Sequence, residues 1–217
     1  MSLTLVIGNK NYSSWSLRPW LVLKVFDIPF EEIVIPLYGA ASRPALLSYS
    51  PAGKVPTLLH DGAPIWDSLA IVEYLAELHP DRAIWPRSGE ARALARSLAC
   101  EMHSGFGVLR HDCPMNLHRP PAALEPRESR AAELARLDAA LSDARARYGE
   151  GGAFLFGDFG AADAMFAPVA ARIDTYALPA SPALRGWIEA VKALPAWREW
   201  ETAALSEPWV LERFEIP

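Results

Sequence analysis

The sequence predicts an α/β unit followed by an all-helical unit, and three observations support this division. Strand-like and helix-like apolar runs alternate over about the first 80 residues. A segment with two prolines and no periodicity, His79–Gly89, then interrupts them. Beyond it, apolar residues recur at helical spacing. We therefore expect one domain at residues 1–80 and a second at residues 88–217.

The first unit opens with a short apolar run, Leu3–Ile7, that reads as a buried strand. A helix over Ser16–Phe26 follows, with Pro19 in its first turn, where the missing N–H has no cost. Phe30–Ile35 is predicted as a second strand, and Ser42–Leu47 as a short irregular helix. The order up to this point is strand, helix, strand, helix.

A hairpin is the strongest local signal in this unit. Two apolar runs, Val55–His60 and Ala63–Trp66, flank Asp61-Gly62. Asp-Gly favours the tight type I′ turn, because both central residues of that turn need positive φ. Ser68 then begins a helix that extends to about Leu78. The hairpin adds antiparallel strands, so the sheet is predicted to be mixed.

The second unit shows helical spacing of apolar residues in three stretches. These are Ala91, Leu94, Ala95, Leu98, Met102 and Phe106; Leu134, Leu137, Leu141 and Tyr148; and Leu184, Trp187, Ile188 and Val191. A loop over residues 118–126 separates the first two stretches. This pattern is typical of a helical bundle.

Composition excludes several classes of function. The formal net charge of −5 argues against nucleic-acid binding, which needs clustered Lys and Arg. No apolar stretch is long enough to span a bilayer, and we read no secretory signal in the first residues. We read Cys100 and Cys113 as buried small hydrophobes, and expect a reducing cytoplasm. No cluster has metal-ligand spacing, so no metal is expected.

Hydroxyl groups are concentrated where the first strand leads into the first helix. The stretch Asn11–Trp20 places Ser13 and Ser14 at this junction. The first N–H groups of a helix lack internal partners and the helix dipole is positive there, so the junction favours an anion. The alternative is that the serines only cap the helix.

The motifs, taken in order, resemble those of cytosolic glutathione S-transferases. Val55-Pro-Thr-Leu58, the Asp-Gly hairpin and Asp67-Ser68 follow one another at the spacing of that family. Residues 156–169 resemble the start of the central helix of its second domain. The resemblance implies a thioredoxin-like N-terminal domain with the order βαβαββα and a helical-bundle C-terminal domain. It also implies glutathione as co-substrate and a homodimer.

Within that family, Ser13-Ser-Trp-Ser-Leu-Arg18 is most similar to the zeta class, which includes maleylacetoacetate isomerases. Trp15 stands where the zeta motif has cysteine, and Pro19-Trp20 also departs from it. Gly160 occupies the helix-capping place that normally holds Ser or Thr, three residues before Asp163. The first departure bears on isomerase activity, since that cysteine lies beside the bound thiol.

The chemical task is to ionise a thiol whose ordinary pKa of about 8.5 leaves it mostly protonated at neutral pH. A serine hydroxyl near the sulfur, together with the start of a helix, stabilises the thiolate. The resemblance assigns this role to Ser13, with Ser14 as the alternative. The phenol of Tyr12 is a third possibility.

The resemblance also implies the residues that hold glutathione. A cis bond before Pro56 would turn the Val55 backbone toward the peptide, and Ser68 would bind the γ-glutamyl carboxylate. Asp67 would face the ammonium group, unless Asp67 and Ser68 form an ordinary cap. Lys54 is a candidate for the glycine carboxylate, the alternative being a solvated surface lysine.

The second substrate is expected between the domains, beside Tyr12 and Trp15 and against the first long helix of the second domain. His103, Phe106 and Arg110 fall at helical spacing there, with His103 and Arg110 on one side. An arginine in an apolar cleft suits a substrate carboxylate or carbonyl. The alternative is that Phe106 packs in the core and Arg110 forms a salt bridge.

These expectations lead to one function and two alternatives. The first is transfer of glutathione to a small electrophile through its thiolate. A glutathione-dependent cis–trans isomerase is the narrower reading of the zeta resemblance. A non-catalytic protein that binds glutathione or another ligand on the same fold is the third.

Overall fold

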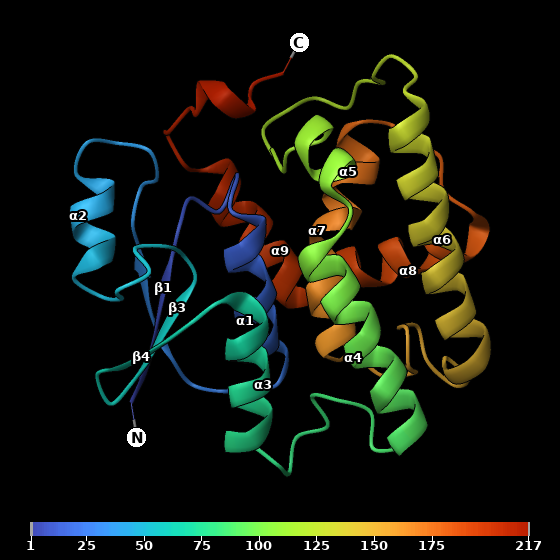
Figure 1. Cartoon of the computed structure of the whole chain (residues 1–217), viewed down its shortest axis with the longest axis horizontal. Coiled ribbons are helices and arrows are strands. Elements are labelled where there is room, and N and C mark those ends of the chain that lie inside the picture. Colours follow the sequence, from blue (N-terminus) through green and yellow to red (C-terminus); the bar gives the residue numbers. More distant parts are fainter. Residues whose placement is uncertain (1, 217) are drawn as a thin grey trace.

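The computed structural model describes residues 2–216. Its first part is a four-stranded sheet with helices against it, and its second part is helical (Figure 1). The strands are β1 (Leu3–Ile7), β2 (Glu31–Val34), β3 (Thr57–His60) and β4 (Ala63–Trp66). The helices of this part are α1 (Ser14–Val25), α2 (Ser42–Leu47) and α3 (Ser68–Leu78). The predicted order βαβαββα is confirmed.

The sheet is mixed, as the hairpin predicts. Its strand order is β2-β1-β3-β4, with β1 parallel to β2 and antiparallel to β3. The turn between β3 and β4 has φ of 48° at Asp61 and 86° at Gly62. Both values are positive, which is the condition that favours Asp-Gly in this turn.

The second part is built from helices that follow the linker. Their bounds are α4 (Gly89–Ser104), α5 (Gly107–Asp112), α6 (Glu128–Tyr148), α7 (Ala161–Thr175), α8 (Pro182–Ala193) and α9 (Pro195–Leu205). A 3₁₀ turn, Glu212–Phe214, lies in the C-terminal tail. None of the helices in the described part of the chain has the length and apolar character that a membrane span requires.

Helix α1 joins the two parts. It packs against α3 in the first part and against α7 in the second (Figure 1). Both α1 and α7 are buried around most of their circumference, as expected for helices covered on all sides. The start of α1, where the predicted serines lie, is therefore fixed by contacts from both parts.

The structure corrects three details of the sequence prediction. Helix α1 begins at Ser14 rather than Ser16, so Pro19 lies beyond its first turn. Phe106 has a φ of 53° and separates α4 from α5, so the helix expected through Arg110 is not continuous. Cys100 is exposed, whereas Cys113 is buried as expected.

Candidate active site

Ser13 is the N-cap of α1 and belongs to a chain of hydroxyl groups. Its Oγ lies 2.7 Å from Ser16 Oγ, and Ser16 Oγ accepts a hydrogen bond from Gly8 N–H at 3.1 Å. Ser16 is fully buried, so its hydroxyl proton needs an acceptor, and Ser13 Oγ supplies one. In this arrangement Ser16 donates to Ser13, and the Ser13 proton stays free to donate to another group.

Ser14 lies in the first turn of α1 and is buried. Its Oγ accepts a hydrogen bond from Arg172 Nη2 of α7 at 3.2 Å. Both candidate hydroxyls therefore accept from a buried donor and keep a proton of their own. Capping accounts for Ser13 only in part, because its Oγ lies 3.4 Å from Ser16 N–H, near the limit for such a bond.

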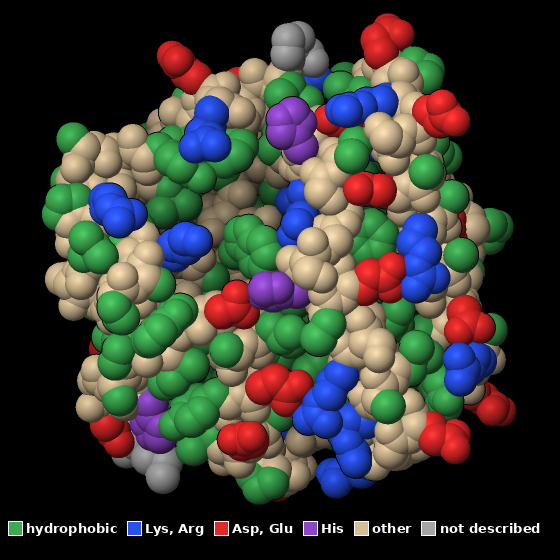
Figure 2. All heavy atoms as spheres, viewed as in Figure 1, with side chains coloured by type: hydrophobic (Ala, Val, Ile, Leu, Met, Phe, Trp, Pro, Cys, Tyr) green, Lys and Arg blue, Asp and Glu red, His purple; other side chains and the backbone are tan. Residues whose placement is uncertain are grey.

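A cavity of about 600 Å³ opens at these serines. Its size is within the usual range for small-molecule sites. The surface in Figure 2 is hollowed between the part that carries α2 and the helices, and Lys and Arg side chains border the hollow. The residues that line it include Tyr12, Ser13, Ser14, Trp15, Tyr38, Arg43, Lys54, Val55, Arg110, Arg172, Arg213 and Phe214.

The charge of this cavity is positive. Five of its lining side chains are Lys or Arg, and none of the lining residues in the described part of the chain is Asp or Glu. The overall charge of the protein is negative, so this positive lining is local. A negatively charged ligand is favoured here, since field lines concentrate in a cleft of one sign.

The segment before β3 forms one edge of the cavity. The Val55–Pro56 peptide bond is cis, as the resemblance implied. Pro56 is buried, while Val55 and the exposed Lys54 line the cavity. Thr57 Oγ1 donates to Lys54 O at 3.1 Å and holds this turn. The structure thus places Lys54 and Val55 on the same cavity as the serines.

Asp67 and Ser68 lie at the start of α3. Asp67 Oδ1 accepts from Leu69 N–H at 2.9 Å, so Asp67 is the N-cap, and its φ is 77°. Asp67 Oδ2 lies 2.7 Å from His103 Nε2. Burial raises the pKa of Asp67, but the hydrogen bonds from His103 and Leu69 outweigh it, so the net pKa lies below the ordinary value. Asp67 is therefore both a cap and a partner of α4.

Arg18 lies behind these residues and is fully buried. Its Nη1 donates weakly to Ser68 Oγ, at 3.5 Å. Burial, with Arg172 and Arg110 nearby, lowers the pKa of Arg18 to about 9, so it stays charged at neutral pH. A buried cation behind Ser68 favours a carboxylate bound by that hydroxyl.

Trp15 contacts two arginines. Its ring centroid is 4.2 Å from Arg18 Cζ and 5.4 Å from Arg110 Cζ, distances typical of cation–π contacts. The ring also meets His103 edge-on, with the centroids 5.2 Å apart. The residue that departs from the zeta motif thus contacts Arg110, which lines the cavity with it, and the buried Arg18.

The structure places some of the residues predicted for the second substrate at the cavity and others away from it. Arg110 lines the cavity, and its Nη1 donates to His103 O at 3.1 Å, so the two residues remain adjacent across the break between α4 and α5. His103 pairs with Asp67. Phe106 is buried against Phe166, with ring centroids 6.4 Å apart, and Met102 is also in the core. The expected alternative of core packing holds for Phe106.

The C-terminal tail forms a wall of the cavity that the sequence did not indicate. Tyr12 Oη donates to Glu215 Oε1 at 2.5 Å, and its ring stacks on Phe214 with centroids 5.6 Å apart. Arg213 lies over the ring of Tyr38 at 4.4 Å. These contacts span about 200 residues of sequence, and no local pattern marks them. The phenol of Tyr12 is engaged with the tail.

Arg172 is the second residue that sequence reasoning missed. A basic residue in the mostly apolar run Ala161–Thr175, whose other charged residues are the acidic Asp163 and Asp174, is the signal that was available for it. Only the folded chain shows that this side chain reaches Ser14.

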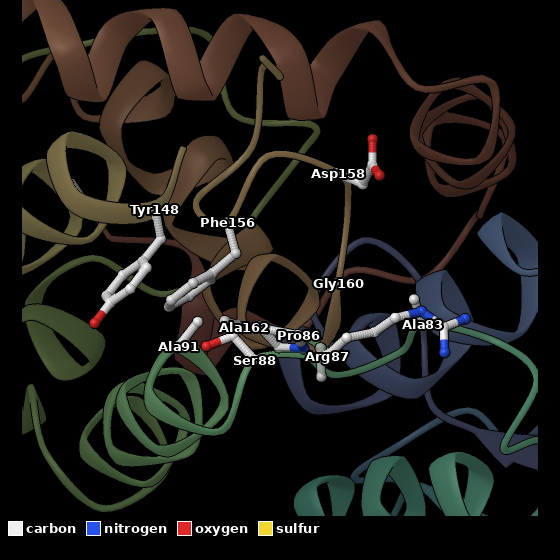
Figure 3. A pocket seen from close by; sticks show the side chains of 11 residues that line it. Ala83, Pro86, Arg87, Ser88, Ala91, Tyr148, Phe156, Asp158, Gly160 and Ala162 are labelled. Atoms are coloured by element: carbon white, nitrogen blue, oxygen red, sulfur yellow. The ribbon is translucent and has the colours of Figure 1, made fainter. Parts of the chain in front are cut away.

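A smaller cavity, of about 330 Å³, lies elsewhere, around the linker (Figure 3). Pro86 and Arg87 of the linker contribute to it, together with the paired rings of Tyr148 and Phe156. The serines are not among its lining residues. Within residues 2–216, no group of His, Cys, Asp and Glu side chains is arranged to hold a metal ion.

The site combines a hydroxyl chain at the start of α1, a cis-proline edge and a helical unit that completes the cavity, and this arrangement agrees with the family resemblance. Residues 12–78 match the family model of the glutathione S-transferase N-terminal domain, and residues 127–203 match that of the C-terminal domain. Together the matches cover more than half of the 217 residues. The chain belongs to the glutathione S-transferase family.

Two curated relatives are similar over part of the chain. A probable maleylacetoacetate isomerase of Caenorhabditis elegans is 38% identical over 96 residues, which are 44% of either chain. Glutathione S-transferase U8 of Arabidopsis thaliana is 43% identical over 86 residues, 39% of this chain and 38% of the relative. The matched stretch therefore spans less than half the length of these relatives.

A solved structure is similar over nearly the whole chain. A glutathione transferase homolog from Burkholderia gl BGR1, crystallised with bound glutathione, superposes with a TM-score of 0.72 and 26% identity. The match covers 95% of this chain and 100% of that one. The thioredoxin-like and helical domains implied by the resemblance are confirmed.

Proposed function

We propose that the protein is a glutathione transferase that uses the glutathione thiolate to attack a small electrophile. The observation that carries the proposal is the hydrogen-bonded chain from Gly8 N–H through Ser16 to Ser13, which lines a cavity with five Lys and Arg side chains. With Gly8 N–H donating to Ser16 and Ser16 donating to Ser13, the Ser13 proton is available to a bound ligand. Donors fixed in this way stabilise an anion without reorganisation.

The remaining residues of the site suit the tripeptide. The Val55 backbone lies beside the cis bond, where it can pair with the glutathione backbone, and Lys54 can reach the glycine carboxylate. Ser68, with Arg18 behind it, offers a site for the γ-glutamyl carboxylate, and Asp67 one for the ammonium group. The homolog with bound glutathione supports this assignment.

The site promotes the reaction by stabilising the negative charge of the glutathione thiolate. The thiol releases its proton to solvent, and the Ser13 hydroxyl donates a hydrogen bond to the resulting thiolate. The sulfur electron pair forms the new carbon–sulfur bond, and in a substitution the leaving group departs with its own pair. Lowering a thiol pKa by about two units corresponds to about 2.7 kcal/mol of preferential stabilisation of the anion.

A glutathione-dependent cis–trans isomerase is a second candidate. The serines of Ser13–Arg18 and the similarity to the maleylacetoacetate isomerase of C. elegans favour it. In that reaction the thiolate adds to a double bond, the adduct rotates, and the thiolate leaves again. Side-by-side assays with a conjugation substrate and with a cis-configured unsaturated diketo acid separate the two reactions.

The decisive experiment measures the ionisation of bound glutathione. Thiolate absorbance in the ultraviolet is followed against pH in the complex and in free solution. We expect the pKa of the bound thiol to be lower. A bound thiol that ionises like the free one would instead favour the non-catalytic binding protein.

Two further expectations follow from the resemblance. We propose a homodimer, which sedimentation at micromolar concentration tests, with a monomer as the contrary result. We also propose a cytoplasmic location, in keeping with the unpaired Cys100 and Cys113. Fractionation of cells that express the protein tests the location.

A further inference from the structure

Arg172 is a buried cation with an unused donor, and it lines the cavity. Its side chain is 3% exposed and rises from α7, whose other residues are mostly apolar. Nε donates to Cys113 O at 2.8 Å, and Nη2 donates to Ser14 Oγ at 3.2 Å. Nη1 is buried without a hydrogen-bond partner. A buried guanidinium that is incompletely paired is costly, so its place here points to an anion in the cavity.

The groups packed around Arg172 do not neutralise it. Within residues 2–216, no carboxylate lies within ion-pair distance of its guanidinium, and the neighbouring charges are those of Arg110 and Arg18. Burial lowers the pKa of Arg172 to about 10. Burial also raises the pKa of Cys113 to about 11 and that of Tyr176 to about 12. At neutral pH the arginine is therefore charged and these two neighbours are neutral.

Ser14 links the Arg172 guanidinium to the cavity surface through a hydrogen bond. Its Oγ accepts from Arg172, so its own proton remains free, and it lines the cavity beside Ser13. A hydroxyl that accepts a hydrogen bond from a cation becomes a stronger donor, because linked hydrogen bonds polarise one another. Ser14 is thus a second donor prepared for the same anion.

We propose that Arg172 is a positioning residue for glutathione activation, which holds Ser14 Oγ so that the Ser14 hydroxyl donates to the glutathione sulfur alongside Ser13. The inference rests on the proposed function and extends it by giving the helical domain a part in thiolate stabilisation. No proton passes along this path. Arg172 and Ser14 remain in one protonation state throughout, and the thiol proton goes to water.

The test is a double-mutant cycle read by the ultraviolet titration of bound glutathione. The proteins compared are the wild type, Arg172→Met, Arg172→Lys, Ser14→Ala and the double variant Arg172→Met with Ser14→Ala. We expect Arg172→Met to raise the pKa of the bound thiol by about one unit, which is about a tenfold loss of thiolate below that pKa. Arg172→Lys keeps the charge and one donor, so its shift should be smaller.

The cycle distinguishes a path through Ser14 from a general charge effect. If Arg172 acts through Ser14, Arg172→Met adds no further shift once Ser14 is alanine. An equal shift in both backgrounds, or no shift from Ser14→Ala alone, overturns the proposal. Arg145→Met removes a partly buried arginine that donates to Ala153 O and Phe154 O and is not among the lining residues of this cavity, so it should leave the bound thiol unchanged.

Folding and the proposed function are controlled separately. Circular dichroism identifies a variant that does not fold, and Arg172→Lys and Ser14→Ala then test the same path with smaller changes. A wild-type complex whose thiol ionises as in free solution refutes the proposed function itself. A lowered wild-type pKa that Arg172→Met leaves unchanged refutes only the role of Arg172.

Discussion

His103 Nε2 lies 2.7 Å from Asp67 Oδ2, so one carboxylate links the first helix of the second domain to the start of α3. The other oxygen of Asp67 caps α3. The pair is partly exposed, with 30% of the His103 side chain and 43% of the Asp67 side chain accessible. Its contribution to stability is therefore small. Its larger consequence is to fix the carboxylate that we assign to the ammonium group of glutathione.

Exchange of Asp67 separates its capping role from its charge. Asn caps helices as well as Asp does and tolerates positive φ, so Asp67→Asn should keep α3 intact. We expect the KM for glutathione to rise about tenfold with kcat little changed, because the ammonium group loses a charged partner. Steady-state kinetics at varied glutathione concentration measure this.

Asp67→Ala is the comparison, since it also removes the cap and should lower stability by about 1 kcal/mol. Equal KM and kcat values in the wild type and Asp67→Asn would show that the Asp67 charge does not contribute to glutathione binding.

The sequence predicted the local features of the sheet unit well because their signals are local. Asp61-Gly62 identified the hairpin from its requirement for positive φ. The cis bond before Pro56 came from the resemblance, since a valine-proline pair by itself favours trans. The break at Phe106 was missed because apolar residues continue at helical spacing up to the point where the backbone changes direction.

The parts of the site that could not be predicted depend on contacts distant in sequence. Arg172 and Ser14 are 158 positions apart, and Tyr12 and Glu215 are 203 apart. The packing of α7 and of the C-terminal tail decides whether a buried polar side chain reaches the site. No local sequence pattern around Arg172 or Glu215 predicts that packing. The roles of Ser13 and Ser14 likewise depend on their hydrogen-bond partners, Ser16 and Arg172, which no local pattern reports.

Ser16 should matter to the site although its buried hydroxyl lies beneath Ser13. Ser16→Ala leaves Gly8 N–H without its acceptor and Ser13 without its donor. We expect a loss of about 1–3 kcal/mol in the free energy of unfolding, from the unsatisfied buried amide. We also expect a higher pKa of bound glutathione. Urea unfolding and the ultraviolet titration measure the two effects.

Ser48→Ala is the matched control, because Ser48 is exposed and bonds only within its own turn. A Ser16→Ala protein that is as stable as this control, with an unshifted thiol, would contradict the hydroxyl chain.

Tyr12→Phe tests whether the phenol serves the thiol or the tail. Burial and the Glu215 carboxylate raise the pKa of Tyr12, so its hydroxyl stays neutral and bonded to the tail. Removing that hydroxyl also leaves Leu211 N–H without its acceptor. We expect a loss of about 1–3 kcal/mol in stability and an unchanged thiol pKa. A thiol pKa that rises in this variant would instead assign the phenol to the thiolate.

The buried carboxyl group of Asp163 should lower the free energy of unfolding as the pH rises, which is opposite to the effect of most carboxyl groups. Burial raises its pKa to about 6, against hydrogen bonds from Leu155 N–H, Trp187 Nε1 and Gly160 N–H that lower it. Between about pH 4 and pH 6 the folded protein therefore keeps a proton that the unfolded chain has released. Because the folded state binds more protons, the contribution of this group to the free energy of unfolding falls as pH rises through that window.

Asp163→Asn removes this titration, and it also removes the acceptor for Gly160 N–H. We expect lower stability overall, and a free energy of unfolding that rises more steeply, or falls less, between pH 4 and pH 6 than in the wild type. Urea unfolding at half-unit pH intervals measures the slope. Asp158→Asn, an exposed carboxylate on the preceding loop, is the control. Parallel curves for the wild type and Asp163→Asn would mean that Asp163 is ionised throughout the window, held so by its three donors.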